Sequence, residues 1–324
     1  MNTGKDIKVS ICCVVYNHSP YLRQCLDGLL MQQTSFDFEI LLHDDASTDG
    51  TTDIIREYAA AYPDLIRPVI QTENQYSSKT RAIITTYLLP LAKGKYIALC
   101  EGDDYWTDPL KLQKQVDMME TNPDISICTH LAVSLFANGA EKIHTLYKQN
   151  QIAPFVDVIR SKQGYWPTAS YVYRKALLKN YPQFCLNCHV GDAPLLYFMA
   201  IQGKVYFFSE VMSVYRKRVP GSHTYKIRNV GDAIHWQAVQ TEFDMLDGFN
   251  AWTNYTYNTL FIEKKLHLQS NILAKRKTWH TRVYTGFDSD LRSVALYKRI
   301  KLIIKIYLLP VLRGNFFKTE KRER

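Results

Sequence analysis

The sequence lacks the features of membrane-spanning, exported and nucleic-acid-binding proteins. Its C-terminal aliphatic run, residues 298–313, is too short and too often interrupted by lysine and arginine to cross a bilayer. The first predicted strand begins within nine residues of the N-terminus, so we expect no signal peptide. No nucleic-acid-binding motif accompanies the net charge of +9, so we expect no nucleic-acid partner. Internal repeats and low-complexity segments are also missing.

Cysteine is present without a pattern that indicates a metal or haem centre. Several of the seven cysteines fall inside predicted strands, as expected of buried thiols in a reducing compartment, so we expect a cytoplasmic protein. Cys185, Cys188 and His189 match the C-x-x-C-H pattern of haem attachment. We interpret this short match as chance, because no export signal accompanies it. A zinc site would need more ligands, and there is no second cysteine pair.

Three apolar runs that end abruptly in polar residues organise the first third of the chain. The runs and the residues that follow them are 9–15 with Tyr16-Asn17, 38–42 with Asp44-Asp45, and 97–100 with Asp103-Asp104. Such runs suit strands buried on both faces of a parallel sheet. Their carboxyl ends would share one crevice, where adjacent carboxylates offer hard oxygen ligands to a divalent cation and a diphosphate. The pattern predicts nucleotide-sugar chemistry.

Helical stretches separate the predicted strands. Ser19 can cap a first helix, and a second is predicted over about 51–61, started by residues 47–49 and stopped by Pro63. A third is predicted over roughly 80–91. Crossovers of this kind indicate a right-handed, Rossmann-like α/β unit. From about residue 231 the pattern changes to long helical stretches without a catalytic motif.

Residues 9–17, 39–50 and 94–115 together resemble family 2 glycosyltransferases of the GT-A fold, in particular bacterial enzymes that build surface polysaccharides. The resemblance covers roughly residues 7–220. It implies an α/β fold with a Rossmann-like, mostly parallel sheet flanked by helices. We expect a catalytic domain over residues 1–225 and a helical C-terminal extension over residues 226–324 that ends in a basic amphipathic tail.

The resemblance implies a nucleotide site at the first two strand ends. Tyr16 would stack on the base, with Asn17 beside it, and Asp45 would accept a hydrogen bond from the ring N–H of uracil. Ordinary packing is the alternative for Tyr16. Helix capping is the alternative for Asp44 and Asp45, and one of the two would do only that.

The family's acidic metal motif corresponds to Asp103 and Asp104. Asp104 is the expected direct ligand of Mg²⁺ or Mn²⁺, and Asp103 would reach the ribose or a metal-bound water. His223, in a predicted loop over the active site, would complete the metal shell. Asp108 is expected to cap the helix that follows.

Asp192 is the expected general base, because in the family an aspartate about ninety residues past the metal motif opens a helix on the acceptor side. Capping of that helix is the alternative role. Glu101 and Asp157 are lesser candidates, and Gly191 stands where many relatives carry Glu. One base without an enzyme nucleophile indicates inversion at the anomeric carbon, since retention by double displacement would need a second placed carboxylate.

Further donor contacts are expected from aromatic and basic residues. Trp166 would stack on a sugar ring or else lie in the core. Arg216 or Arg218 would hold the diphosphate, unless the two form a solvated charge cluster. Lys79 and Arg81 are weaker candidates for nucleotide contacts.

These observations favour an inverting glycosyltransferase that moves sugar from a UDP-sugar to a glycan or lipid-linked acceptor. A sugar-1-phosphate nucleotidyltransferase would carry a glycine-rich basic loop after the first strand, which is missing here. A non-catalytic nucleotide-sugar-binding protein is the other alternative. Residues 296–324 contain nine Lys and Arg and two Glu, so we expect them to lie on the anionic inner face of the cell membrane or to pack on the body as a helix.

Overall fold

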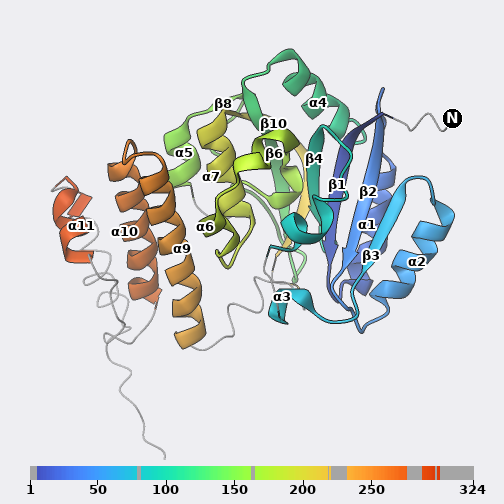
Figure 1. Ribbon diagram of the computed structural model, residues 1–324, viewed down its shortest axis with the longest axis horizontal. Coiled ribbons are helices and arrows are strands. Elements are labelled where there is room, and N and C mark those ends of the chain that lie inside the picture. Colours follow the sequence, from blue (N-terminus) through green and yellow to red (C-terminus); the bar gives the residue numbers. More distant parts are fainter. Residues whose placement is uncertain are drawn as a thin grey trace, which may run out of the picture. The chain divides into compact units, whose positions relative to one another are not determined.

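The computed structural model describes residues 6–78, 82–161, 165–217, 219, 232–275, 287–295 and 298–299 (Figure 1). The chain divides into two compact units, Met1–Asp232 and Ala233–Arg324. The first unit contains the sheet and its surrounding helices, and the second is helical in its described part. The domain boundary predicted at residue 225 lies in a stretch outside the described residues.

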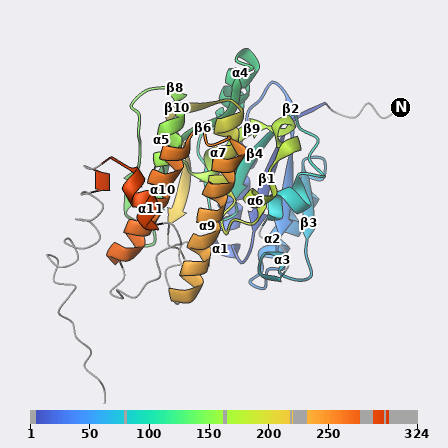
Figure 2. The same cartoon turned by 60° about the vertical axis from the view of Figure 1, so that its left-hand side comes forward.

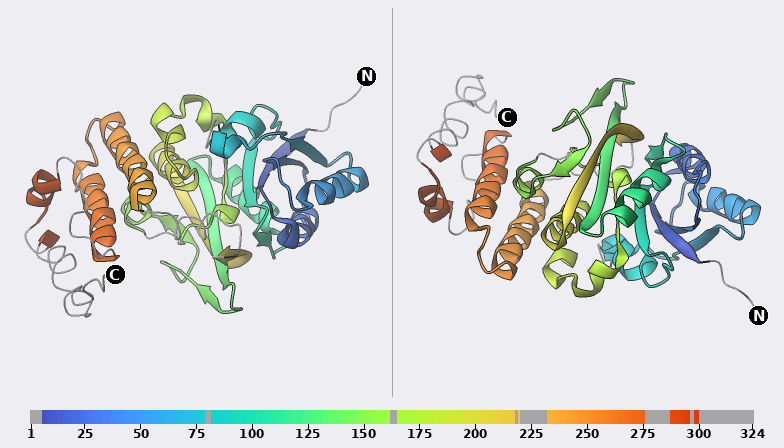
Figure 3. Two further views of the ribbon diagram at one scale, coloured as in Figure 1. Left: turned by 90° about the horizontal axis from the view of Figure 1, so that it is seen from below. Right: turned by 90° about the horizontal axis from the view of Figure 1, so that it is seen from above.

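A ten-stranded sheet forms the centre of the first unit (Figure 3). Its strands are β1 (Ile7–Val15), β2 (Asp37–Asp44), β3 (Ile66–Ile70), β4 (Tyr96–Glu101), β5 (Tyr105–Trp106), β6 (Ile125–Phe136), β7 (Glu141–Ile143), β8 (Gln151–Ala153), β9 (Val172–Arg174) and β10 (Lys204–Lys217). The main order is β3-β2-β1-β4-β9-β6-β10-β5, with β7 on β6 and β8 on β10.

The predicted α/β fold with a mostly parallel sheet is confirmed, and short antiparallel strands are added to it. Strands β3, β2, β1 and β4 are parallel neighbours, as are β6 and β10. The short strands β5, β7, β8 and β9 all pair antiparallel. The parallel part therefore corresponds to the nucleotide-binding half that the apolar runs predict, and the antiparallel strands lie beyond it.

Helices surround the sheet and form the second unit. In the first unit they are α1 (Ser19–Leu30), α2 (Thr51–Ala61), α3 (Gln75–Ser78), the π-helical η1 (Ile84–Leu88), α4 (Lys111–Thr121), α5 (Phe155–Arg160), the 3₁₀ turns η2 (Thr168–Ser170) and η3 (Lys175–Asn180), α6 (Gln183–Leu186) and α7 (Asp192–Gln202). The second unit is built from α9 (Asp232–Trp252), α10 (Asn258–Lys275) and α11 (Phe287–Ser293).

Three local expectations need correction. Ser19 is the first residue of α1 and not its cap: the N-cap position belongs to His18, which makes no side-chain cap, and the N–H of Ser19 donates to Asp49 Oδ2 at 3.0 Å. The helix predicted over 80–91 is reduced to η1, preceded by the separate helix α3. Strand β3 was not predicted, since Pro68 sits inside it, and it lies at the sheet edge, where proline is tolerated.

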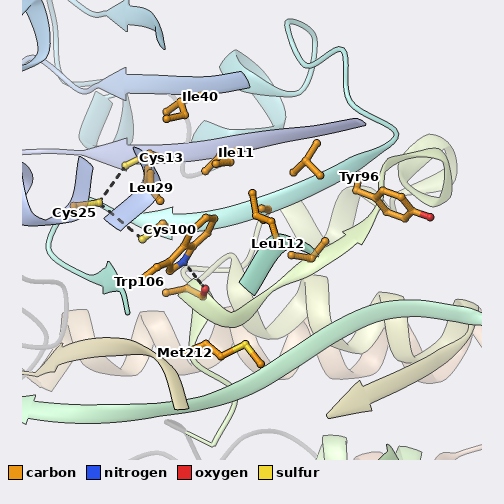
Figure 4. Close-up of a cluster of buried hydrophobic side chains, with 14 of the residues drawn as sticks. Ile11, Cys13, Cys25, Leu29, Ile40, Tyr96, Cys100, Trp106, Leu112 and Met212 are labelled. Carbon is orange, nitrogen blue, oxygen red and sulfur yellow. Dashed lines mark hydrogen bonds between the residues drawn. The ribbon is translucent and has the colours of Figure 1, made fainter. Parts of the chain in front are cut away.

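Alternation along the central strands separates a packed face from an open one. Ile11 and Cys13 of β1 belong to the main core, which α1 and α4 also help to build (Figure 4). Trp106 fills this core and its Nε1 donates to Ala169 O at 2.9 Å. Cys12 and Val14 alternate with these core positions along β1, and both line a cavity instead. Because successive side chains of a strand point to opposite faces, the site and the core lie on opposite sides of the sheet.

The second unit has a core of its own, in which α9 and α10 run side by side (Figure 2). Phe249 and Phe261 stack with ring centroids 6.3 Å apart, and Lys265 donates to Asp247 Oδ1 at 2.8 Å. These contacts join the two helices near the turn between them and along their length. In the described part of the chain, no helix has both the length and the apolar content that crossing a bilayer requires.

Candidate active site

A cavity of about 570 Å³ opens at the carboxyl ends of β1, β2 and β4. Five residues that the sequence predicts for the site line it together: Tyr16, Asp45, Asp103, Asp192 and Arg216. They come from loops that follow three parallel strands, from the start of α7 and from β10. Crevices at this edge of a parallel sheet are the usual ligand sites of α/β folds.

The loops after β1 and β2 hold one another in an unusual backbone conformation. Asn17 and Ala46 have φ angles of 55° and 62°, in the left-handed region that residues other than glycine rarely adopt. Asn17 Oδ1 accepts the N–H of Thr48 at 2.8 Å, and the N–H of Asn17 donates to Ser47 Oγ at 2.9 Å. Asn17 is not among the residues that line the cavity, so its visible role is to connect the two loops.

Asp45 both lines the cavity and caps α3. Its Oδ1 accepts the N–H of Gln75 at 2.7 Å, and its Oδ2 accepts the N–H of Tyr76 at 3.1 Å. Asp44 has only structural contacts here, since its Oδ1 accepts the N–H of Ser47 and its Oδ2 the hydroxyl of Thr52. Each carboxylate oxygen can accept two hydrogen bonds, so the Asp45 carboxylate retains acceptor capacity toward the cavity.

The acidic motif after β4 is drawn close to the end of β1. A Cβ atom on Gly102 would lie 2.9 Å from Val15 Cγ1, so glycine permits this approach. Asp103 faces the cavity, with its Oδ2 4.0 Å from His18 Nε2. Asp104 is fully buried, and its Oδ1 accepts the backbone N–H of Arg216 at 2.8 Å.

Arg216 fastens the acidic motif to β10. Its Nη1 donates to Asp103 O at 2.6 Å and its Nη2 donates to Gln24 Oε1. The guanidinium also lies 5.0 Å from the ring centre of Tyr21 and 4.6 Å from that of Tyr105. A guanidinium that contacts two aromatic rings and donates two hydrogen bonds is pre-organised, so Arg216 is a fixed positive charge at the cavity wall.

Four carboxylates crowd this region. Desolvation inside the cavity, followed by the charges of Asp103 and Asp192, raises the pKa of Glu101 above its usual range, although its side chain keeps exposed surface at the end of β4. Burial, followed by the charges of Asp103 and Glu101, raises the pKa of Asp104 well above its usual range. The pKa of Tyr215 on the cavity wall is raised as well, by burial first and then by the carboxylates. Such crowding of negative charge favours the binding of a cation.

The donor set fits a divalent cation held jointly with a substrate. Asp104 Oδ2 is buried and has no hydrogen-bond partner among the described residues, which is costly for a carboxylate oxygen. The same part of the chain contains no group of three or more His, Cys, Asp or Glu residues that could hold a metal by itself. Mg²⁺ is commonly held by one or two carboxylates together with substrate phosphates, so Asp103 and Asp104 suffice on the protein side.

Asp192 begins α7 and faces the same cavity. Its Oδ1 accepts the N–H of Ala193 at 2.8 Å, so the carboxylate lies at a helix N-terminus that stabilises its negative charge. Asp157, by contrast, accepts a hydrogen bond from Tyr147 OH at 2.9 Å and is not a cavity residue. Among the weaker candidates for the base, the cavity therefore includes Glu101 and leaves out Asp157.

Trp166 is buried, with 7% of its surface exposed, and it is not one of the residues that line the cavity. Its Nε1 donates to Ser161 Oγ at 2.6 Å, and its ring packs edge-on against Phe207 with centroids 5.9 Å apart. This environment matches the core alternative for Trp166 rather than a stacking platform for sugar.

Four predicted site residues lie outside the described residues: Lys79, Arg81, Arg218 and His223. Most of the basic tail, residues 296–324, lies outside them as well. Tyr76 and His189 line the cavity without having been singled out as ligand contacts, and Tyr76 OH donates to His189 O at 3.2 Å. Their places depend on how α3 and the segment before α7 meet in space, and no local motif signals that contact.

The model of the glycosyl transferase family 2 matches residues 10–180 of the chain. A Mycobacterium tuberculosis protein, the uncharacterized protein Rv1520, is 36% identical over 221 residues, which cover 66% of this chain and 60% of that protein. The chain thus spans less than two thirds of this relative's length. The poly(ribitol-phosphate) beta-glucosyltransferase of Bacillus spizizenii is 28% identical over 174 residues, or 53% of this chain and 26% of that enzyme.

Two solved structures share the fold at low sequence identity. TarS 1–349 of S. aureus in complex with UDP has a TM-score of 0.57 and 15% identity, covering 92% of this chain and 79% of that one. The mannosyltransferase PcManGT from Pyrobaculum calidifontis, in complex with GDP-Man and Mn²⁺, has a TM-score of 0.53 and 16% identity, covering 98% of this chain and 92% of that one.

Proposed function

The chain belongs to glycosyl transferase family 2, and on that premise we propose that it transfers sugar from a UDP-sugar to a glycan or lipid-linked acceptor in surface polysaccharide synthesis. The observation that carries the proposal is the single cavity that gathers Tyr16, Asp45, Asp103, Asp192 and Arg216. A poly(ribitol-phosphate) glucosyltransferase among the relatives and UDP in the complex of TarS support the acceptor class and the donor.

The donor base lies at the ends of β1 and β2. Tyr16 stacks on uracil, while Asp45 accepts the ring N–H with the acceptor capacity that the cap on α3 leaves over. Asn17 keeps these two loops together and acts on the nucleotide through them. Arg216, fixed between Tyr21 and Tyr105, faces the diphosphate.

Asp103 and Asp104 would hold Mn²⁺ or Mg²⁺ together with the donor diphosphate. Asp104 contributes the oxygen that lacks a hydrogen-bond partner, and Asp103 approaches from the cavity side. The Arg216 N–H fixes the other oxygen of Asp104, which orients its carboxylate. When bound, the cation neutralises charge that develops on the departing nucleoside diphosphate. His223 and Arg218 are proposed to join from the loop after β10.

Asp192 takes the proton of the acceptor hydroxyl. Its position at the N-terminus of α7 places the carboxylate in the lining of the cavity, where the helix dipole favours its charge. The acceptor oxygen then attacks the anomeric carbon from the face opposite the nucleoside diphosphate, so the product has inverted configuration. The enzyme is proposed to work on the cytoplasmic membrane surface, to which the basic tail over residues 296–324 is attracted.

Release of nucleoside diphosphate tests the proposal. We expect slow release from one UDP-sugar in a panel of UDP-, GDP- and dTDP-sugars, dependent on Mn²⁺ and abolished by EDTA. Release from a GDP-sugar alone would contradict the role of Asp45. Tight, metal-dependent binding of UDP with no release, even when acceptors are supplied, would identify a nucleotide-sugar-binding protein instead.

A further inference from the structure

The turn between α9 and α10 presents bulky aromatic side chains to solvent. We call residues 251–259 the hairpin tip, and apart from the half-buried Thr253 all of them are exposed. The exposed fractions of its aromatic residues are 39% for Trp252, 63% for Tyr255 and 37% for Tyr257. Figure 1 shows this turn at the common end of the two helices. Such a concentration of exposed aromatic surface usually marks an interaction site.

The hairpin tip holds Tyr255 outward at a conformational cost. Asn254 and Tyr255 have φ angles of 48° and 59°, and a left-handed conformation is unfavourable for a bulky residue such as tyrosine. The N–H of Tyr255 donates to Asn250 O at 2.8 Å, and Asn250 Nδ2 donates to Asn258 Oδ1 at 2.8 Å, which fixes the turn. Glycine would adopt this backbone without strain, so the aromatic ring is not there to form the turn.

Most backbone N–H groups of the hairpin tip are hydrogen-bonded. The N–H groups of Thr253, Asn254, Tyr255, Thr256 and Asn258 all donate to carbonyl oxygens of the tip or of the last turn of α9. The hydroxyls of Thr253 and Thr256 also donate to carbonyls, at 2.9 Å and 2.6 Å. These internal hydrogen bonds lower the cost of moving the tip from bulk water into a lipid interface, because a paired polar group loses less on leaving water than an unpaired one.

Charge is distributed so that the hairpin tip is neutral and its unit is basic. Residues 248–262 contain no Asp, Glu, Lys, Arg or His. Residues 233–324 contain 16 Lys and Arg against 8 Asp and Glu, a net charge of +8, and the basic tail over residues 296–324, with nine Lys and Arg and two Glu, contributes +7 of it. A basic unit is attracted to anionic headgroups, and Trp and Tyr rings are favoured at headgroup depth because they combine an apolar body with a polar edge.

We propose that the hairpin tip inserts Trp252, Tyr255 and Tyr257 into the headgroup layer of an anionic lipid bilayer. The inserted residues are distinct from the basic tail, whose charge supplies the attraction to anionic lipid, and the contact needs neither the cavity nor glycosyl transfer. Insertion recovers free energy from the exposed rings and offsets the strained backbone of Tyr255. The uncharged tip provides the apolar contact, while the lysines and arginines of residues 296–324 provide attraction at longer range.

Flotation with vesicles tests the proposal. The full chain should float with phosphatidylcholine vesicles that contain phosphatidylglycerol and much less with pure phosphatidylcholine. A triple variant, Trp252→Ser, Tyr255→Ser and Tyr257→Ser, should bind the anionic vesicles at least about tenfold more weakly, since binding scales with buried apolar area. Tyr62→Ser is the matched control, because Tyr62 is 45% exposed at the end of α2 in the other unit, and it should bind like wild type.

Tyr255→Gly separates lipid contact from folding. Because glycine relieves the strain of the left-handed backbone, the melting temperature of the Tyr255→Gly variant should equal or exceed that of wild type. Its binding to anionic vesicles should be weaker. Nucleoside-diphosphate release in solution should stay unchanged in all these variants, so the outcome is independent of the proposed activity. Unchanged flotation of the triple variant would overturn the proposal. The proposal would also be overturned if the wild type were a dimer that does not bind vesicles and the triple variant were a monomer. That result would assign the tip to contact with a second copy of the chain.

Discussion

Asp192→Asn should lower the rate of sugar transfer by about 10²–10⁴-fold, the usual contribution of a positioned general base. Asparagine keeps the oxygen that accepts the N–H of Ala193, so the start of α7 should be preserved while the basic group is lost. The dissociation constant of UDP should therefore stay at the wild-type value. The measurement is the initial rate of nucleoside-diphosphate release at saturating donor, together with calorimetric titration of UDP.

Asp157→Asn is the matched control for this experiment. Asp157 accepts a hydrogen bond from Tyr147 and is not a cavity residue, so its replacement should leave turnover close to wild type. If Asp192→Asn retained full turnover, Asp192 would be reduced to a helix-capping residue. The base would then have to be sought among the other carboxylates of the cavity, beginning with Glu101.

Asp104→Asn should remove the gain in UDP affinity that Mn²⁺ provides. In the presence of Mn²⁺, the dissociation constant of UDP should rise by about 10–100-fold, a loss seen even when only the residues that support a metal ligand are changed. The amide oxygen can still accept the N–H of Arg216, while the NH₂ group that replaces the second oxygen cannot bind a cation. Burial disfavours a charged Asp104, so the metal-free variant should be at least as stable as wild type. Titrations of UDP with Mn²⁺ and with EDTA measure the first effect, and thermal unfolding measures the second.

Asp108→Asn is the matched control for Asp104→Asn. Asp108 lies four residues further along, accepts the N–H of Leu110 and pairs with Lys114, all outside the cavity lining. Its replacement should leave the effect of Mn²⁺ on UDP binding intact. If instead Asp104→Asn showed the wild-type Mn²⁺ dependence, the cation would have to be held without Asp104.

Much of the parallel half of the fold was predictable because burial there leaves a strong local pattern. The apolar runs before Tyr16 and Asp45 correspond to β1 and β2, and the predicted second helix coincides with α2. The edge strand β3 gives a weak signal, because its side chains alternate in exposure and Pro68 interrupts it. The third helix was predicted too long, because within the range 80–91 residues 84–88 form a π-helical turn, a rare element with no recognised sequence periodicity.

The site was predictable where a residue directly follows a strand. The strands themselves place Tyr16, Asp45 and Asp103 at one edge, so their meeting in one cavity follows from topology. Trp166 could not be assigned from sequence, because a tryptophan is equally suited to a core and to a sugar platform, and its burial depends on partners such as Phe207. The hydrogen bonds that Arg216 donates to Asp103 and Asp104 join positions more than a hundred residues apart. Local sequence patterns do not encode such contacts.

The most direct test of the account is a crystal structure of the protein grown with UDP and Mn²⁺. We expect uracil between Tyr16 and Asp45 and the diphosphate directed toward Arg216, with Mn²⁺ coordinated by the carboxylates of Asp103 and Asp104. The remaining space beside Asp192 should be open for donor sugar and acceptor. UDP bound elsewhere, or bound in this cavity with Mn²⁺ remote from both aspartates, would contradict the central claim that this edge of the sheet is a metal-assisted nucleotide-sugar site.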